Sequence, residues 1–140
     1  MDKEIVNRIS FLVPILIMVL LCTFGVVHYF SSDDYIMNYI SMGEGIGTPN
    51  EHLIFINIVL GYILKLEYFL CPYINWFGLM YIITILLCTY GVLYVFSRHI
   101  NIFLALFIAV LIEMILIIFL EFTPIAYICT AVGVMLGLDS

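Results

Sequence analysis

Long apolar stretches alternate with short polar segments along most of the chain. The apolar stretches occupy residues 10–30, 53–70, 76–97, 100–120 and 122–138. About 20 apolar residues in a helix are enough to cross the roughly 30 Å hydrocarbon core of a bilayer. The pattern therefore predicts an all-α protein, a polytopic transmembrane helix bundle formed by a single membrane domain over residues 1–140.

One substantial polar segment interrupts this pattern at residues 31–52, with the sequence SSDDYIMNYISMGEGIGTPNEH. Its glycines and Pro49 break regular structure, whereas residues 35–42 have the composition of a short surface helix that is half apolar. If the N-terminus is cytoplasmic, this segment, which directly follows the first apolar stretch, forms an acidic loop outside the cell.

The stretch at residues 53–70 differs from the others because it contains Lys65 and Glu67. Asn57, Gly61 and Lys65 follow each other at intervals of four residues and form a narrow polar stripe on one helical face. Lys65 and Glu67 are two positions apart and do not face each other, so each charge needs its own solvation. A helix lying in the membrane interface meets this need more easily than a spanning helix.

Positive charges give an independent indication of the topology, because loops rich in Lys and Arg stay in the cytoplasm. Lys3 and Arg8 precede the first apolar stretch, and Arg98 follows the third. If residues 53–70 lie on the outer face, all three are cytoplasmic; if this stretch spans, Arg98 is outside. We therefore predict a multi-pass cell-membrane protein with a cytoplasmic N-terminus, an outer interfacial amphipathic helix at 53–70, and about four spans, at residues 10–30, 76–97, 100–120 and 122–138.

Composition and charge narrow the classes of function. The chain is 66% hydrophobic and 10% charged, far from the roughly 25% charged residues of soluble domains, so the lipid bilayer is its expected surrounding. A formal net charge of −6 argues against nucleic-acid binding, which needs a basic surface. The four cysteines stand singly in apolar segments and indicate small buried side chains. No nucleotide-binding, zinc-protease or serine-hydrolase motif is present.

Five acidic or imidazole side chains are candidates for chemistry. Asp33 and Asp34 follow the first apolar stretch, where a carboxylate takes a proton from a hydroxyl or holds a divalent cation, or simply solvates the end of a span. His52 is suited to orienting a phosphate or a sugar hydroxyl, but a solvated histidine near a helix start is the simpler interpretation. Glu121 lies at a span boundary. Glu113 lies inside a span and is either protonated against another helix or close to a cavity.

The order of these parts resembles the N-terminal portion of the GT-C class of membrane glycosyltransferases, in particular bacterial enzymes that modify surface polysaccharides. The resemblance rests on the segments FSSDDY, GTPNEH, FINIVLGYILKLEYFLCPYINW and EFTPIAYICTAVGVMLG. It implies transfer of a sugar from a polyprenyl-phosphate donor to a surface glycan or lipid acceptor. It also implies Asp33 or Asp34 as the catalytic base or metal contact and Glu121 as a later acidic position. We expect an outer site formed by these residues together with His52.

The chain also departs from that class. Members of the class are several times longer, and no arginine remains on the predicted outer side to hold a lipid phosphate. We therefore expect either a fragment of a longer enzyme or a shortened homologue that has lost catalysis or needs a partner. The alternative is a non-enzymatic membrane subunit that binds another membrane protein. A third interpretation, a small ion or proton carrier, rests on Glu113 alone.

Overall fold

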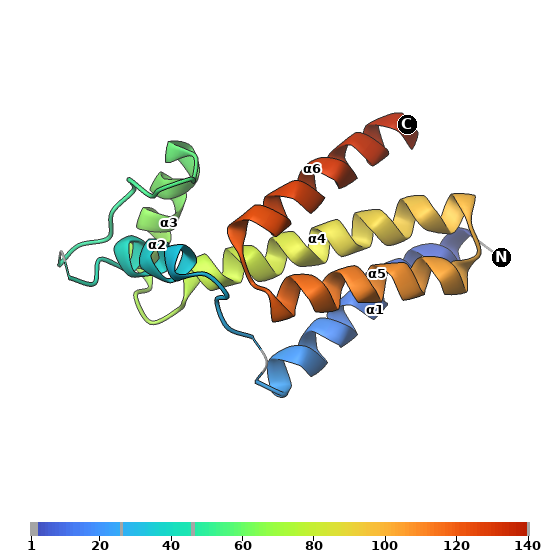
Figure 1. Ribbon diagram of the computed structural model, residues 1–140, viewed down its shortest axis with the longest axis horizontal. Helices are drawn as coiled ribbons and strands as arrows, with labels where there is room; N and C mark the ends of the chain where they lie inside the picture. The colour runs from blue at the N-terminus through green and yellow to red at the C-terminus, as the bar shows by residue number, and fades with distance from the viewer. Residues whose placement is uncertain (1–2, 26, 46, 140) are drawn as a thin grey trace. The chain divides into compact units, whose positions relative to one another are not determined.

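The computed structural model of the protein describes residues 3–25, 27–45 and 47–139. Every regular element in these ranges is an α-helix, which confirms the all-α prediction. The helices labelled in Figure 1 are α1 (Lys3–Thr23), α2 (Ser32–Met42), α3 (Ile58–Leu70), α4 (Trp76–His99), α5 (Ile102–Ile118) and α6 (Phe122–Asp139).

The chain divides into two compact units, which we describe separately. The bundle unit consists of residues 1–28 and 82–140 and contains α1, most of α4, α5 and α6. The loop unit consists of residues 29–81 and contains α2, α3 and the first residues of α4. The loop unit thus corresponds to the acidic segment and the amphipathic stretch of the sequence.

Two of the described helices are long and apolar enough to cross a membrane, namely α4 with 24 residues and α6 with 18. The helix α5, with 17 residues, and the apolar part of α1, Phe11–Thr23, are shorter than this. The four predicted spans therefore correspond to four helices, of which two, α4 and α6, are both long and apolar enough to cross a membrane.

The first helix differs from the predicted span at residues 10–30. It begins at Lys3 and ends at Thr23, so residues 27–30 are not helical. Gly25 has a φ of 68°, a left-handed conformation that glycine adopts without steric cost and that commonly terminates helices. The hydropathy of residues 24–30 continues past this point, which is why the apolar pattern alone overestimates the span.

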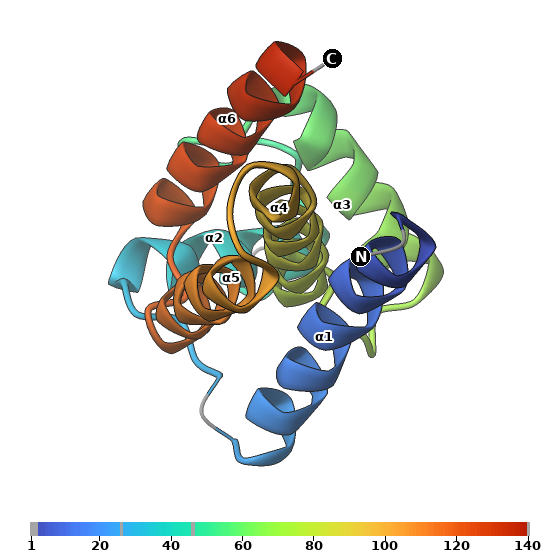
Figure 2. The ribbon, with the colours of Figure 1, turned by 90° about the vertical axis from the view of Figure 1, so that its right-hand side faces the viewer.

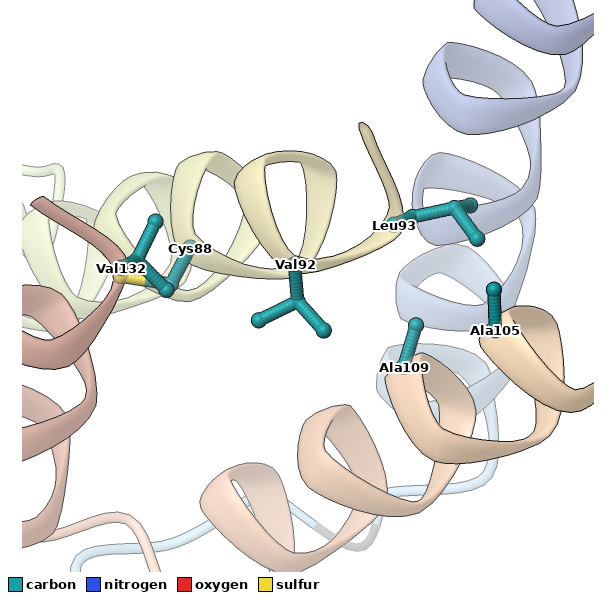
Figure 3. Packing of buried hydrophobic residues seen from close by; sticks show 6 residues of the cluster. All are labelled: Cys88, Val92, Leu93, Ala105, Ala109 and Val132. Carbon is teal, nitrogen blue, oxygen red and sulfur yellow. The ribbon is translucent and has the colours of Figure 1, made fainter. Parts of the chain in front are cut away.

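The bundle unit is built around the second half of α4, and Figure 2 shows α1, α5 and α6 surrounding it. The buried cluster that joins α4, α5 and α6 is shown in Figure 3 and consists of Cys88, Val92, Leu93, Ala105, Ala109 and Val132. Small side chains allow helices to approach closely in a membrane. Gly91 is the clearest example, because an added Cβ would lie 2.4 Å from Val132 Cγ1.

Candidate functional site

The acidic pair lies at the start of α2, where the local sequence caps the helix. Ser31 is the N-cap residue, and its Oγ accepts the Asp34 backbone N–H at 3.2 Å. The same hydroxyl donates to Asp34 Oδ2 at 2.8 Å. Ser31 thus caps the helix start through the Asp34 backbone N–H and holds the Asp34 carboxylate with the same hydroxyl. The sequence therefore fixes where α2 begins and how Asp34 is oriented.

Asp34 is buried inside the loop unit, with only 1% of its surface exposed. Its Oδ1 accepts a hydrogen bond of 2.5 Å from the hydroxyl of Tyr81, which is also 1% exposed. A hydrogen bond to a charged group is stronger than a neutral one, and breaking it would leave a buried carboxylate poorly satisfied. Asp34 therefore holds the start of α2 against α4.

Asp33 occupies the same helical turn but is exposed. Neighbouring positions on a helix point about 100° apart, so a buried Asp34 leaves Asp33 directed outward. The positive end of the α2 dipole favours a carboxylate in this first turn. Of the two predicted catalytic aspartates, Asp33 is thus accessible to a substrate and Asp34 is enclosed.

A second polar cluster joins α2, α3 and the start of α4 around Tyr68. Its hydroxyl lies 3.1 Å from Asn38 Oδ1 and 3.3 Å from Asn75 Oδ1, and it accepts the Phe77 backbone N–H at 3.0 Å. The single hydroxyl proton is shared between the two amide oxygens. Burial raises the pKa of Tyr68, which keeps this proton in place at neutral pH. Asn75 Oδ1 also accepts from the Tyr29 hydroxyl at 3.3 Å.

The helix α3 is shorter than the predicted helix at 53–70. It begins at Ile58, where Asn57 acts as the N-cap and its Oδ1 accepts the Val59 N–H at 2.9 Å. Residues 53–56 are irregular, and Phe55 adopts a positive φ of 65°. Residues 53–56 are mainly apolar, so composition alone extended the predicted helix over them. The helix start is set by the N-cap Asn57.

The polar stripe of α3 serves a different purpose from the one predicted. Lys65 was expected to be solvated alone, but its Nζ lies 2.5 Å from Glu51 Oε2 in the preceding loop. At Gly61 the same loop comes so close that an added Cβ would lie 2.0 Å from the Glu51 carbonyl oxygen. The loop therefore packs on the stripe at Gly61 and Lys65. Polar groups that find partners within the protein do not need water as a partner.

The hydrogen bond with Lys65 is the main reason that the pKa of Glu51 lies below its usual range. Glu51 and Lys65 are 14 positions apart, so the pair holds the later part of the loop between α2 and α3 against α3. The two contacts on α3, one ionic and one between backbones, together fix the position of this loop.

The other predicted site residues lie apart from the aspartates in the chain. His52 is in the loop before α3, with its Nδ1 3.2 Å from Asn50 Oδ1 and 3.7 Å from Glu51 Oε1. Its side chain is 74% exposed. Glu121 is half-buried at the junction of α5 and α6, in the bundle unit. The structure thus brings Asp33 and Asp34 together in one helical turn, while His52 has local contacts and Glu121 belongs to the other unit.

Glu113 lies on α5 and is fully buried. Neither of its carboxyl oxygens has a hydrogen-bond partner among the described residues. An ionised carboxylate in such a place is costly unless it is protonated, paired or hydrated. The two sequence-based interpretations of Glu113, a protonated carboxyl packed against another helix and a carboxyl close to a cavity, stay predictions.

A charged cluster joins the C-terminal ends of α4 and α6 in the bundle unit. Arg98 Nη1 lies 2.6 Å from Asp139 Oδ2, and His99 Nε2 lies 2.9 Å from Asp139 Oδ1. The guanidinium of Arg98 also stacks on the ring of Tyr94, 4.0 Å from its centroid. The basic cluster that the topology argument used is thus neutralised in part by the end of α6.

Within the described ranges, no group of three or more His, Cys, Asp or Glu side chains is arranged to hold a metal ion. Sequence reasoning missed three structural partners of the site, namely Ser31, Tyr81 and Tyr68. The spacing of Ser31 and Asp34 is a recognisable capping signal. The two tyrosines have no local signal, because they are distant in sequence from the residues that they contact.

Comparison with known proteins adds no relative: no family model matches the chain, and no curated protein or solved structure matches it.

Proposed function

We propose that the chain is a multi-pass membrane protein with a cytoplasmic N-terminus, about four spans and the loop unit on the outer face. The core helix of a soluble protein is mostly buried, but only 11% of the apolar segment of α6 is buried. Large apolar side chains also face outward from the bundle unit, including Phe103 and Leu138, which are 77% and 84% exposed. A bilayer covers such a surface at no cost, whereas water does not.

The length of α3 supports its assignment to the interface. Its 13 residues rise by about 20 Å as a helix, which is less than the roughly 30 Å hydrocarbon core. Its polar stripe is contacted by the Glu51 loop at Gly61 and Lys65. Apolar side chains such as Phe69 and Leu70 are exposed at 78% and 72%. This is the surface expected of a helix that lies on a membrane.

Within this framework we propose a glycosyltransferase-like function, in which a sugar moves from a polyprenyl-phosphate donor to a hydroxyl of a surface glycan or lipid acceptor. The observation that carries this proposal is the contrast between the two adjacent aspartates. Asp33 is exposed in a helical turn that Asp34 fixes rigidly from inside. A rigidly held, accessible carboxylate on the outer face is what a general base requires.

The proposed roles follow from these positions. The Asp33 carboxylate accepts the proton of the acceptor hydroxyl while the hydroxyl oxygen attacks the sugar, and the polyprenyl phosphate leaves with the bonding electron pair. Asp34 positions Asp33 through α2 without contacting the substrate. His52, which lies in the same unit as Asp33, is proposed to contact the donor or the acceptor.

The test compares the surface glycans of cells that express the wild-type chain or its variants. Asp33→Asn should reduce transfer by about 100-fold or more while the amount of inserted protein stays unchanged. Glu44→Gln, which alters another exposed carboxylate of the loop unit, should leave transfer intact. Unchanged glycans in the Asp33→Asn cells, or no difference between cells with and without the wild-type chain, would contradict an enzymatic role for this chain alone.

The second candidate function is a non-enzymatic membrane subunit. It is favoured by an exposed apolar stripe on α5, where Phe103, Phe107 and Leu111 recur at intervals of four residues with 77%, 60% and 41% exposure. Residues at this spacing lie on one helix face and fit a partner helix. For this function, Phe107→Ala should reduce co-purification of a membrane partner, and Asp33→Asn should not.

A further inference from the structure

The loop unit contains an open groove of about 530 Å³ between α3 and the preceding loop. Its lining residues are Thr48, Pro49, Tyr62, Lys65, Leu66 and Phe69. Pockets for small molecules usually measure about 300 to 1,000 Å³, so the groove is large enough for the headgroup and the first part of one chain of a lipid.

The helical wall of the groove is apolar and outward-facing. Tyr62, Leu66 and Phe69 are 55%, 58% and 78% exposed, and their spacing places them on one face of α3. On a helix in the membrane interface, such a face is covered by lipid chains. Lipid binding at this face therefore rests on the outer interfacial position of α3 that the proposed function includes.

The charges beside this apolar wall restrict the headgroup. Lys65 lines the groove with 43% of its side chain exposed, and it is already paired with Glu51. It is the only lysine or arginine among residues 29–81, against five carboxylates, which gives the loop unit a formal charge of −4. A purely anionic headgroup would be attracted by one half-neutralised cation and repelled by the remaining carboxylates.

We propose that this groove binds a zwitterionic glycerophospholipid of the outer leaflet, for which phosphatidylethanolamine serves as the probe. The lipid phosphate is held by Lys65, and the ammonium group is attracted by the net negative charge of the loop unit. One acyl chain follows Tyr62, Leu66 and Phe69. A headgroup that carries both charges complements a half-exposed lysine in a unit of formal charge −4, which neither an anionic lipid nor an uncharged one does.

The test measures lipids retained by the purified full chain, using native mass spectrometry after extraction from vesicles. The vesicles contain equal amounts of phosphatidylethanolamine, phosphatidylglycerol and polyprenyl phosphate. We expect preferential retention of phosphatidylethanolamine. Lys65→Met should reduce it about tenfold, as expected for one lost charge-assisted hydrogen bond, whereas Arg98→Met, which removes a cation from the bundle unit, should not change it.

A second variant keeps the proposal testable if Lys65→Met fails to fold. Glu51→Gln leaves Lys65 without its partner carboxylate, so the preference should shift from phosphatidylethanolamine toward phosphatidylglycerol. On the apolar wall, Leu66→Asn should weaken retention, while Ile63→Asn, at an exposed position of α3 outside the groove, should retain the lipid.

Equal retention of all three lipids by wild-type protein would overturn the proposal, as would a wild-type preference for phosphatidylglycerol or polyprenyl phosphate. No shift in Glu51→Gln would also overturn it. The outcome is separable from that of the proposed function, because Asp33 lies outside the groove lining. Asp33→Asn should lose sugar transfer and keep the lipid, whereas failure of the lipid proposal alone would leave transfer dependent on Asp33.

Discussion

The hydroxyl of Tyr81 lies 2.5 Å from Asp34 Oδ1 and connects two residues that are 47 positions apart in the chain. Both side chains are 1% exposed. Through this contact the first residues of α4 determine how α2, and with it the exposed Asp33, is held.

Removing the Tyr81 hydroxyl should therefore destabilise the protein. Tyr81→Phe leaves a buried carboxylate oxygen without this donor, and we expect a loss of roughly 1–3 kcal/mol in the free energy of unfolding. Chemical denaturation of the purified protein in detergent measures this. Tyr73→Phe is the control, because Tyr73 lies in the same unit and is 96% exposed. Equal stability of the two variants would show that the hydrogen bond contributes nothing.

The Glu51–Lys65 pair predicts a dependence of stability on pH. The pKa of Glu51 is lowered, chiefly by its hydrogen bond with Lys65. A carboxyl whose pKa is lower in the folded state stabilises that state above its unfolded pKa, and this contribution disappears as the pH falls through the folded value. Wild-type protein should thus lose more stability on acidification than Lys65→Met does. If the free energy of unfolding fell equally with pH in the two proteins between neutral and acidic pH, the pairing would be contradicted.

The close approach at Gly61 predicts a steric effect. Gly61→Ala would place a Cβ 2.0 Å from the Glu51 carbonyl oxygen, so the backbone must shift, at a cost of about 1–3 kcal/mol. Gly133→Ala on α6 is the matched control, because nothing lies within 4 Å of an added Cβ there. Alanine has a higher helix propensity than glycine, so Gly133→Ala should leave the melting temperature unchanged or raise it. A melting temperature that is unaffected by Gly61→Ala would argue against the contact.

The proposed topology predicts which positions react with a membrane-impermeant thiol reagent. In a chain whose native cysteines are replaced, Leu60→Cys on α3 should be labelled in intact cells. Ser97→Cys, near the C-terminal end of α4, should be labelled only after permeabilisation. Labelling of Ser97→Cys from outside would overturn the topology, and would favour a spanning position for the stretch that contains α3.

Local features of this fold were predictable from the sequence, and contacts across the chain were not. The alternation of apolar and polar stretches indicated helices, and the Ser31 to Asp34 spacing is a capping signal that lies within one helical turn. The sequence shows the polar stripe formed by Asn57, Gly61 and Lys65 and predicts separate solvation for Lys65. Nothing in the local sequence indicates that the Glu51 segment packs against this stripe.

The same distinction applies to the candidate site. The exposure of Asp33 and the burial of Asp34 could not be read from two adjacent, identical residue types. The difference depends on the orientation of α2, which is set by Tyr81 on another helix. The position of His52 in an exposed loop agrees with its sequence context, because the neighbouring Pro49 and Asn50 favour irregular structure.

The composition of the two units also bears on how the protein matures during synthesis. The loop unit is contiguous in sequence and ends at Tyr81, so its last stabilising contact becomes available as soon as that residue leaves the ribosome. The bundle unit is formed by two segments of the chain, and its buried cluster is complete only after Val132 has been synthesised. Since segments with local contacts fold earlier than those with distant ones, the loop unit is expected to fold while the later helices are still being inserted, with Tyr81 as its closing contact.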